Sequence, residues 1–199
     1  MRKKSHLSLA SYILNSQGME VLCKYKIAFY WGNILPDCVP SFFTRKHCIE
    51  DTFHIMEKEL TLLIEDYDYN KGITGYFCKH LGILLHYIAD YFTYPHNTFF
   101  TGSMVEHCLY EKEMKLFLRS YIKSNVQNMV TKKIKPLPDS NGVAYISSLV
   151  KEAHKQYSKS KHSVKNDCEF ILSICHQVVD FILAIGKREC LSMHQAIIC

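Results

Sequence analysis

The residues with the clearest chemical potential are two histidine–carboxylate pairs in the middle of the chain. His86 and Asp90 lie four positions apart inside the apolar run LGILLHYIADYF, and His107 and Glu111 repeat that spacing. On a helix, side chains four positions apart lie on the same face, one turn from each other. An ionisable group among leucines and isoleucines is costly unless it has a partner. The spacing and the setting therefore indicate paired or metal-binding groups.

The segment between the two pairs predicts a bend in the chain. Pro95 has no amide proton and disfavours helix at Tyr94, so the first helix should end near residue 92 or 93. Ser103 and Glu106 form the pattern of a capping box at the start of a new helix. A helix, a bend and a second helix would allow five side chains to converge: His86, Asp90, His96, His107 and Glu111.

Imidazole nitrogens and carboxylate oxygens are ligands that zinc commonly takes, and catalytic zinc keeps one position open for water. An aspartate has two oxygens, so Asp90 could contact two metal ions. The same four-residue spacing occurs elsewhere, as in His176 and Asp180. A lone pair of this kind is more often structural, and we interpret that pair and His80 as structural. Only the central stretch combines two such pairs with an intervening Pro-His.

The central stretch resembles the metal-binding core of the zinc-dependent phospholipase C family. The match consists of H-Y-x-x-D at residues 86–90, P-H at 95–96 and H-x-x-x-E at 107–111. The related single-strand-specific zinc nucleases share that fold and a similar site. The resemblance implies that His86 and Asp90 bind a first zinc ion, and that His96, His107 and Glu111 bind a second.

The resemblance adds two residues to the first zinc site. Asp37 follows a proline, which by itself signals a turn. In the family, the aspartate of this Pro-Asp is proposed as a neighbour of the first zinc ion or as a general base. A histidine ligand follows it, and His47 is the best counterpart because it lies near the Asp37 loop, at the start of an expected helix. His54 is the competing candidate.

A third zinc site is implied by His6, which corresponds to an early histidine of the family. That histidine binds the third ion together with the bridging aspartate, here Asp90, and the amino terminus of the mature enzyme. The first residue of this sequence is Met1, whereas the secreted enzymes begin with a tryptophan. We therefore expect the Met1 amine to lie out of reach of this site.

The elements that must position these residues are long helices. Only 8 Gly and 5 Pro occur in 199 residues, of which 48% are hydrophobic, so we expect an all-α multi-helix bundle and a single domain, 1–199. The segment 73–92 is apolar on nearly all sides and should be the buried hub, and Gly75 and Gly82 should allow close helix approach. In the helix expected at 106–124, the inward residues should be Leu109, Leu116, Phe117 and Tyr121. The remaining helices are expected at 5–15, 24–30, 44–67, 144–158 and 167–185, the last ending at Gly186.

Composition also bears on the surroundings of the protein. The formal net charge of +5 is compatible with an anionic substrate or lipid surface but does not identify one. The nine cysteines form no C-x-x-C motif, and an odd number cannot be fully paired, so we expect a reducing compartment. We find no secretory signal and no apolar run long enough to span a membrane, which predicts a cytoplasmic protein.

These observations together predict a zinc-dependent phosphodiester hydrolase resembling phospholipase C, with two zinc ions, or three if the site at His6 forms. The expected substrate is of phospholipid type, with transient contact to a membrane surface. One alternative is a nuclease-type phosphodiesterase that acts on single-stranded nucleic acid and stacks its bases on aromatic side chains. Another is a scaffold that zinc stabilises without turnover. The sequence gives no indication of the oligomeric state. The candidate aromatic residues for the nuclease alternative are Tyr91, Phe92, Tyr94, Phe99 and Phe100.

Overall fold

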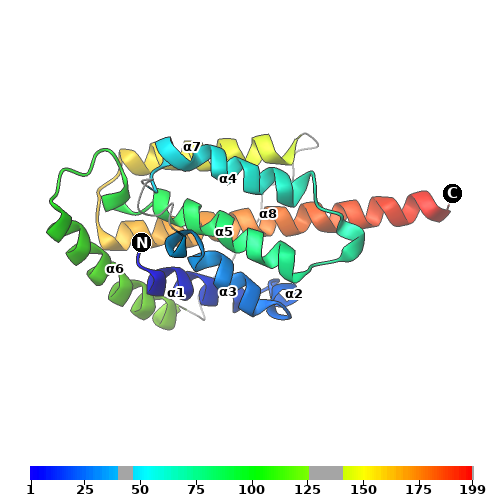
Figure 1. Cartoon of the computed structure of the whole chain (residues 1–199), viewed down its shortest axis with the longest axis horizontal. Coiled ribbons are helices and arrows are strands. Elements are labelled where there is room, and N and C mark those ends of the chain that lie inside the picture. Colours follow the sequence, from blue (N-terminus) through cyan, green and yellow to red (C-terminus); the bar gives the residue numbers. More distant parts are fainter. Residues whose placement is uncertain (40–46, 126–140, 199) are drawn as a thin grey trace.

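The computed structural model describes residues 1–39, 47–125 and 141–198, and of these the side chains of 125 and 192–198 are not described. Within these ranges the chain is helical and has no strand, which confirms the all-α prediction (Figure 1). That the chain forms one domain stays a prediction. The α-helices are α1 (Lys3–Leu14), α2 (Glu20–Cys23), α3 (Lys26–Ile34), α4 (Ile49–Ile64), α5 (Gly75–Tyr91), α6 (Met104–Asn125), α7 (Gly142–Ser158) and α8 (Val164–Ile198), and the 3-10 turns are η1 (Pro36–Cys38), η3 (Tyr69–Lys71) and η4 (Tyr94–His96).

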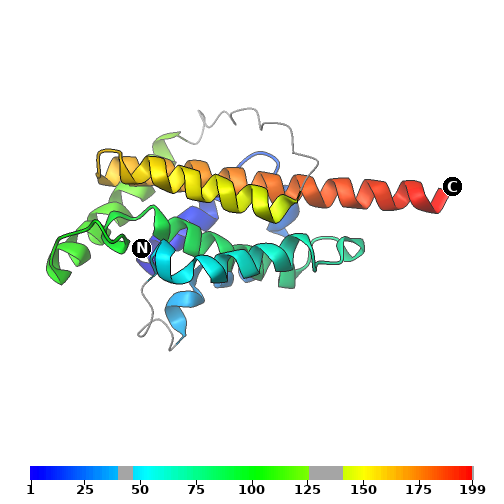
Figure 2. The same ribbon diagram turned by 90° about the horizontal axis from the view of Figure 1, so that it is seen from above.

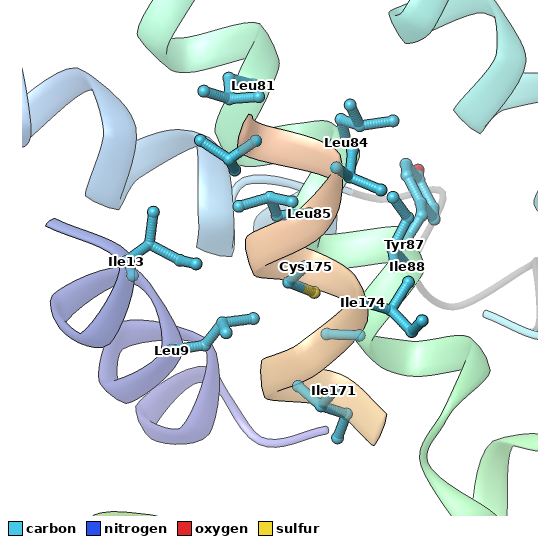
Figure 3. Packing of buried hydrophobic residues seen from close by; sticks show 14 of the residues in the cluster. Leu9, Ile13, Leu81, Leu84, Leu85, Tyr87, Ile88, Ile171, Ile174 and Cys175 are labelled. Atoms are coloured by element: carbon cyan, nitrogen blue, oxygen red, sulfur yellow. The ribbon is translucent and has the colours of Figure 1, made fainter. Parts of the chain in front are cut away.

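Helix α5 is the centre of the bundle and packs against α1, α3, α4 and α8 (Figures 1 and 2). Its first turn is capped by Thr74, whose hydroxyl accepts a hydrogen bond from the amide of Phe77 at 3.3 Å. Apolar side chains surround the helix, so it is buried on several sides at once. Figure 3 shows residues of α1 and α8 closing on the buried face of α5: Leu9, Ile13, Leu81, Leu84, Leu85, Ile88, Ile171, Ile174 and Cys175.

Two glycines allow α3 and α5 to cross at close range. A Cβ atom on Gly32 would lie 2.0 Å from the carbonyl oxygen of Lys79, and one on Gly82 would lie 2.5 Å from that of Phe29. Neither position therefore has room for a side chain. The prediction that Gly82 permits close approach is confirmed, whereas a Cβ on Gly75 would make only an ordinary contact, 3.5 Å from Tyr25. The close crossing fixes the end of α3 against α5.

The link between α5 and α6 follows the predicted helix, bend and helix. Helix α5 ends at Tyr91, η4 contains Pro95, and α6 begins at Met104. Ser103 and Glu106 form the predicted capping box: the Ser103 amide donates to the Glu106 carboxylate at 2.7 Å, and the Glu106 amide donates to the Ser103 hydroxyl at 3.3 Å.

The predicted inner face of α6 was wrong in part, because Phe117 and Tyr121 pack against the core as expected but Leu109 and Leu116 do not. Leu109 and Leu116 are 58% and 59% exposed, whereas Met114 and Leu118 are fully buried. Both pairs recur at helical spacing, so the periodicity gives two apolar stripes. Which of them meets the core depends on how α6 crosses the bundle.

Helix α8 corrects two further expectations. It continues through Gly186, where the ring of Tyr69 fills the space that a side chain would take, and its C-terminal end projects beyond the other helices (Figures 1 and 2). The stretch Val164–Leu191 is also long and apolar enough to cross a membrane by length and composition, contrary to the expectation that no segment is. Since 61% of its most apolar part is buried inside the protein, it also fits a core helix.

A further difference concerns where α4 begins. The helix expected at 44–67 is α4 and starts at Ile49, so His47 lies just before it rather than within it. Residues 40–46 and the expected loop at 131–139, with its lysines and prolines, lie outside the described residues.

Candidate metal centre

The candidate site lies at the end of α5 that is nearest the N-terminus of the chain (Figure 1). Side chains reach it from the start of α1, from η1, from the residue before α4, from the last turns of α5, from η4 and from α6. The eight predicted residues fall into three groups, and within each group the donor atoms lie within 4.8 Å of one another. Two of the groups share His86, and the three are His47, His86 and Asp90; His96, His107 and Glu111; and His6, Asp37 and His86. The structure thus brings the predicted side chains together, while their binding of metal stays a prediction.

The first group consists of His47, His86 and Asp90, all buried. His47 Nδ1 lies 3.0 Å from Asp90 Oδ2 and 3.1 Å from His86 Nε2. His86 Nε2 lies 3.3 Å from the same carboxylate oxygen. Three donor atoms therefore surround one small space, as the ligands of a metal ion do.

The ring of His86 is oriented by the backbone of α3. Its Nδ1 lies 2.9 Å from the carbonyl oxygen of Asn33. Because a carbonyl can only accept a hydrogen bond, Nδ1 carries the proton and Nε2 presents its lone pair to the site. The Gly32–Gly82 crossing holds that carbonyl against α5. Sequence reasoning missed Asn33, since no side-chain motif marks a contact made by a backbone oxygen.

Asp37 stands beside the first group in the 3-10 turn η1. Its Oδ1 lies 3.8 Å from His86 Nε2 and 3.9 Å from His47 Nδ1. The side chain is buried, and burial raises the pKa of the carboxyl group above its ordinary value. Pro36 begins the turn and restricts the backbone next to the carboxylate. Asp37 is thus placed as the prediction requires, close to the first group but farther from it than Asp90.

The second group consists of His96, His107 and Glu111, all partly buried. Glu111 Oε1 lies 3.2 Å from His96 Nε2 and 3.4 Å from His107 Nε2. Burial alone would raise the pKa of Glu111, but its contacts with His107 and His96 outweigh burial and lower it. The turn η4 supplies one candidate ligand and α6 the other two, so the geometry of this group depends on how the turn packs against the helix.

Asp90 joins the two groups. Its Oδ2 faces the first group and also lies 3.6 Å from His96 Nδ1. Its Oδ1 lies 3.4 Å from His6 Nε2 and contacts the amino group of Met1. Burial favours the neutral acid, but the nearby positive charge and imidazoles outweigh burial and hold the pKa of Asp90 well below its usual value.

The position of the Met1 amine overturns the expectation that it lies out of reach. Besides Asp90, it lies 3.0 Å from His96 Nε2 and 3.5 Å from Glu111 Oε1. Burial opposes its positive charge, but the two carboxylates outweigh burial and raise its pKa. Sequence reasoning missed this contact, because nothing local relates residue 1 to residues 90 and 111.

His6 completes the cluster on the side of α1. Its ring stacks on that of His86, with centroids 4.0 Å apart, and neither of its ring nitrogens forms a hydrogen bond although both are buried. Burial and the neighbouring His86 lower the pKa of His6 to about 3, so the ring is neutral and its lone pair is available. A buried, unsatisfied imidazole nitrogen is costly, and a bound cation would satisfy it.

The donor set fits zinc. Tetrahedral zinc with bonds of about 2.0–2.1 Å places two nitrogen ligands roughly 3.3 Å apart, close to the 3.0–3.4 Å separations within the first and second groups. The imidazoles are accompanied by three carboxylates, Asp37, Asp90 and Glu111, whose combined negative charge favours more than one divalent cation.

The histidines that were interpreted as structural lie apart from this cluster. His80 pairs with Glu59 at 2.7 Å, and His176 pairs with Asp180 at 3.0 Å. His54 is exposed on α4, whereas His47 is buried in the first group. The position of His47 therefore favours it over His54 as the ligand.

Comparison with known proteins gives one match. A model of the family described as zinc-dependent phospholipase C matches residues 5–164, which include every predicted site residue. No curated protein and no solved structure matches the chain.

Proposed function

The chain belongs to the zinc-dependent phospholipase C family, and on this premise we propose that it hydrolyses phosphate diesters of the phospholipid type with bound zinc. The observation that carries the proposal is the sharing of Asp90 by both ligand groups. One carboxylate oxygen lies 3.0 Å from a nitrogen of His47 and 3.6 Å from one of His96. Two cations held by those groups would face the same phosphate.

The proposed ligands follow from the geometry. We assign His47, His86 and Asp90 to the first zinc ion, and His96, His107 and Glu111 to the second. A third ion would take His6 and Asp90, near the Met1 amine. Zinc bound there supplies Lewis-acid stabilisation of the phosphate charge and water that is acidic enough to react near neutral pH.

The remaining roles belong to side chains of the chain itself. Asp37 is a candidate proton acceptor, because burial raises its pKa and its carboxylate stands next to the first group. The Asn33 carbonyl oxygen, 2.9 Å from His86 Nδ1, keeps the proton of His86 on the ring nitrogen that faces away from the site. For Asp37→Asn we expect kcat to fall by about 100-fold or more, as for loss of a general base, with the zinc content measured alongside.

The nuclease alternative gains no specific support. A stacking platform needs an aromatic face that is free to receive a base. Tyr94 stacks on Phe99 and on His162, with centroids 6.0 Å and 4.6 Å apart, and Tyr91 and Phe92 are fully buried. Tyr94 thus packs against neighbouring rings, and Tyr91 and Phe92 belong to the hydrophobic core.

The proposal is tested by measuring zinc and turnover on the same preparation. We expect at least two zinc ions per chain by elemental analysis and chelator-sensitive release of diacylglycerol from phosphatidylcholine vesicles. A bis-p-nitrophenyl phosphate assay reports diester hydrolysis without a lipid requirement, and single-stranded DNA is the comparison substrate. His96→Ala with His107→Ala should remove one zinc ion and the activity.

Other results of these assays would favour a different function. Degradation of single-stranded DNA without release of diacylglycerol would favour the nuclease alternative over the phospholipase proposal. Two zinc ions and a lower melting temperature on chelation, with no turnover on any substrate, would replace it by the zinc-stabilised scaffold. Vesicle binding that persists in chelator would show membrane-surface contact independent of catalysis. A cytoplasmic location stays a prediction.

A further inference from the structure

A buried carboxylate outside the candidate site joins α8 to three other elements. Asp167 lies in the first turn of α8 and is fully buried. Its Oδ2 accepts hydrogen bonds from the amide of Tyr94 and the hydroxyl of Tyr110, both at 2.8 Å. Its Oδ1 accepts one from the hydroxyl of Tyr157, also at 2.8 Å. One side chain thus ties η4, α6 and α7 to the start of α8.

Two of these three partners are next to ligands of the second group. Tyr94 is the first residue of η4, which ends at His96. Tyr110 precedes Glu111 on α6 and lies about one turn after His107. Because the same carboxylate oxygen bonds both partners, it fixes the turn that presents His96 relative to the helix that presents the other two ligands.

Other contacts hold the turn in shape. The amide of Asn97 donates to the carbonyl of Thr93 at 2.8 Å, and its oxygen lies 2.7 Å from His154 Nε2 on α7. The ring of His162 stacks on that of Tyr94 at 4.6 Å. These contacts set the shape of the bend. Toward α6, the ring of Tyr94 contacts that of Tyr110 at 5.8 Å, and the Met1 amine lies near both His96 and Glu111. Asp167 adds a hydrogen bond to each of the two elements through one oxygen atom.

We propose that Asp167 is a positioning residue for the second zinc site, which it serves by holding η4 and α6 at the separation that His96, His107 and Glu111 require. The inference rests on the proposed function, because it presumes that this group binds zinc. Three donors meet Asp167, and a carboxylate can accept all of them. An asparagine of the same shape would turn an amide nitrogen toward at least one donor, so a bond would be lost.

The two tyrosines provide a matched pair of variants. Tyr110→Phe and Tyr157→Phe each remove one hydroxyl that bonds Asp167 at the same distance, and each keeps the ring. Only Tyr110 lies on a helix that carries ligands of the second group. A purely structural role for Asp167 predicts similar effects of the two changes, whereas a positioning role predicts different effects on zinc.

The experiment measures zinc bound per chain of the intact protein in zinc buffers of graded free concentration, with the melting temperature of each sample. His107→Ala identifies which part of the binding curve belongs to the second site. Loss of a residue that orients a ligand typically weakens metal affinity by about 10–100-fold. We expect Tyr110→Phe and Asp167→Asn to weaken the second site by about 10-fold or more, and Tyr157→Phe to leave it within about 2-fold of wild type.

Two results would contradict the inference, and they can be told apart. Equal weakening by Tyr110→Phe and Tyr157→Phe, or none by Tyr110→Phe, overturns the positioning role while the proposed function stands. If the wild-type protein binds no second zinc ion in this titration, both the proposed function and this inference are overturned. If Asp167→Asn does not fold, the comparison of the two tyrosine variants still decides.

Discussion

Asp90 is the residue that contacts both candidate ligand groups, because its two carboxylate oxygens face different partners. The type and spacing of the ligands were readable from the sequence, since His86 and Asp90 share a helical face and the Pro-His and the second pair follow in order. The Met1 amine and the Asn33 carbonyl were not readable. The first contacts a residue 89 positions away, and the second acts through its backbone.

Replacing Asp90 by asparagine tests its central position. Asp90→Asn keeps the shape of the side chain but loses the negative charge, and an amide nitrogen is not a zinc ligand. We expect the zinc content to fall by at least one ion per chain and kcat to fall by more than the roughly 10–100-fold that loss of an orienting partner costs.

Asp180→Asn is the matched control for this change. Asp180 pairs with His176 at 3.0 Å with the same four-residue spacing, on α8 and away from the site. It should leave both zinc content and kcat unchanged. If Asp90→Asn behaves like Asp180→Asn, the shared-carboxylate account of the site is wrong.

The choice between His47 and His54 makes a second residue-scale prediction. His47 is buried 3.0 Å from Asp90, whereas His54 lies exposed on α4. His47→Ala should therefore lower zinc content and activity, and His54→Ala should change neither, as measured by elemental analysis and diester hydrolysis. Zinc loss in His54→Ala alone would reverse the assignment.

At the scale of elements, helix positions are set by contacts that periodicity only partly anticipates. The apolar run of α5 predicted a buried hub, and the structure confirms that burial. The end of α8 was mispredicted, because a glycine in a helix is tolerated where a neighbouring ring, here that of Tyr69, packs against it. The prediction that Leu109 and Leu116 of α6 face inward failed for a similar reason. The helix has two apolar stripes, and tertiary packing selects the one with Met114 and Leu118.

The crossing of α3 and α5 predicts that the helix contact and the site are coupled. In Gly82→Ala, the added Cβ would lie 2.5 Å from the carbonyl oxygen of Phe29, so the helices must separate. We expect a loss of about 1–3 kcal/mol in the free energy of unfolding by urea. We also expect weaker binding of the first zinc, because the Asn33 carbonyl moves away from His86.

Gly75→Ala serves as the control at the other end of α5. Its Cβ would make an ordinary contact, 3.5 Å from Tyr25. This variant should retain wild-type zinc affinity. A Gly82→Ala variant with unchanged stability and zinc binding would mean that the close crossing does not position the site.

The junction of α6, α7 and α8 at Asp167 predicts a pH dependence of stability. Burial raises the pKa of this carboxyl group from its ordinary 3.8 to about 6, even though Tyr94, Tyr157 and Tyr110 donate to it. Between these values the folded state binds more protons than the unfolded state, so this group's contribution to the free energy of unfolding falls as pH rises. Relative to Asp167→Asn, the wild type should lose on the order of 2 kcal/mol between about pH 4 and pH 6.

Urea unfolding of both zinc-free proteins in chelator, across this pH range, measures the difference. Tyr110 and Tyr157 stay neutral there, because burial raises the pKa of both phenols, and the distant Met1 amine stays charged. A difference that rises with pH would mean that the three hydrogen bonds outweigh burial and lower the pKa of Asp167 instead.

At the scale of the whole molecule, the predicted helical fold brings the candidate metal ligands together. Low glycine and proline content predicted a helical bundle, and the bundle places residues from both halves of the chain at one end of α5. The family match ends at residue 164, yet the first turn of α8, just beyond it, bonds the elements that carry the second group. The C-terminal helix therefore contacts the elements that carry the second group as well as the core.

The central claim is that the two ligand groups around Asp90 bind zinc, and an anomalous difference map from crystals of the zinc-loaded protein tests it most directly. With data collected above and below the zinc absorption edge, we expect one peak among His47, His86 and Asp90, and another among His96, His107 and Glu111. Well-ordered side chains in both groups with no zinc peak in either would contradict the account.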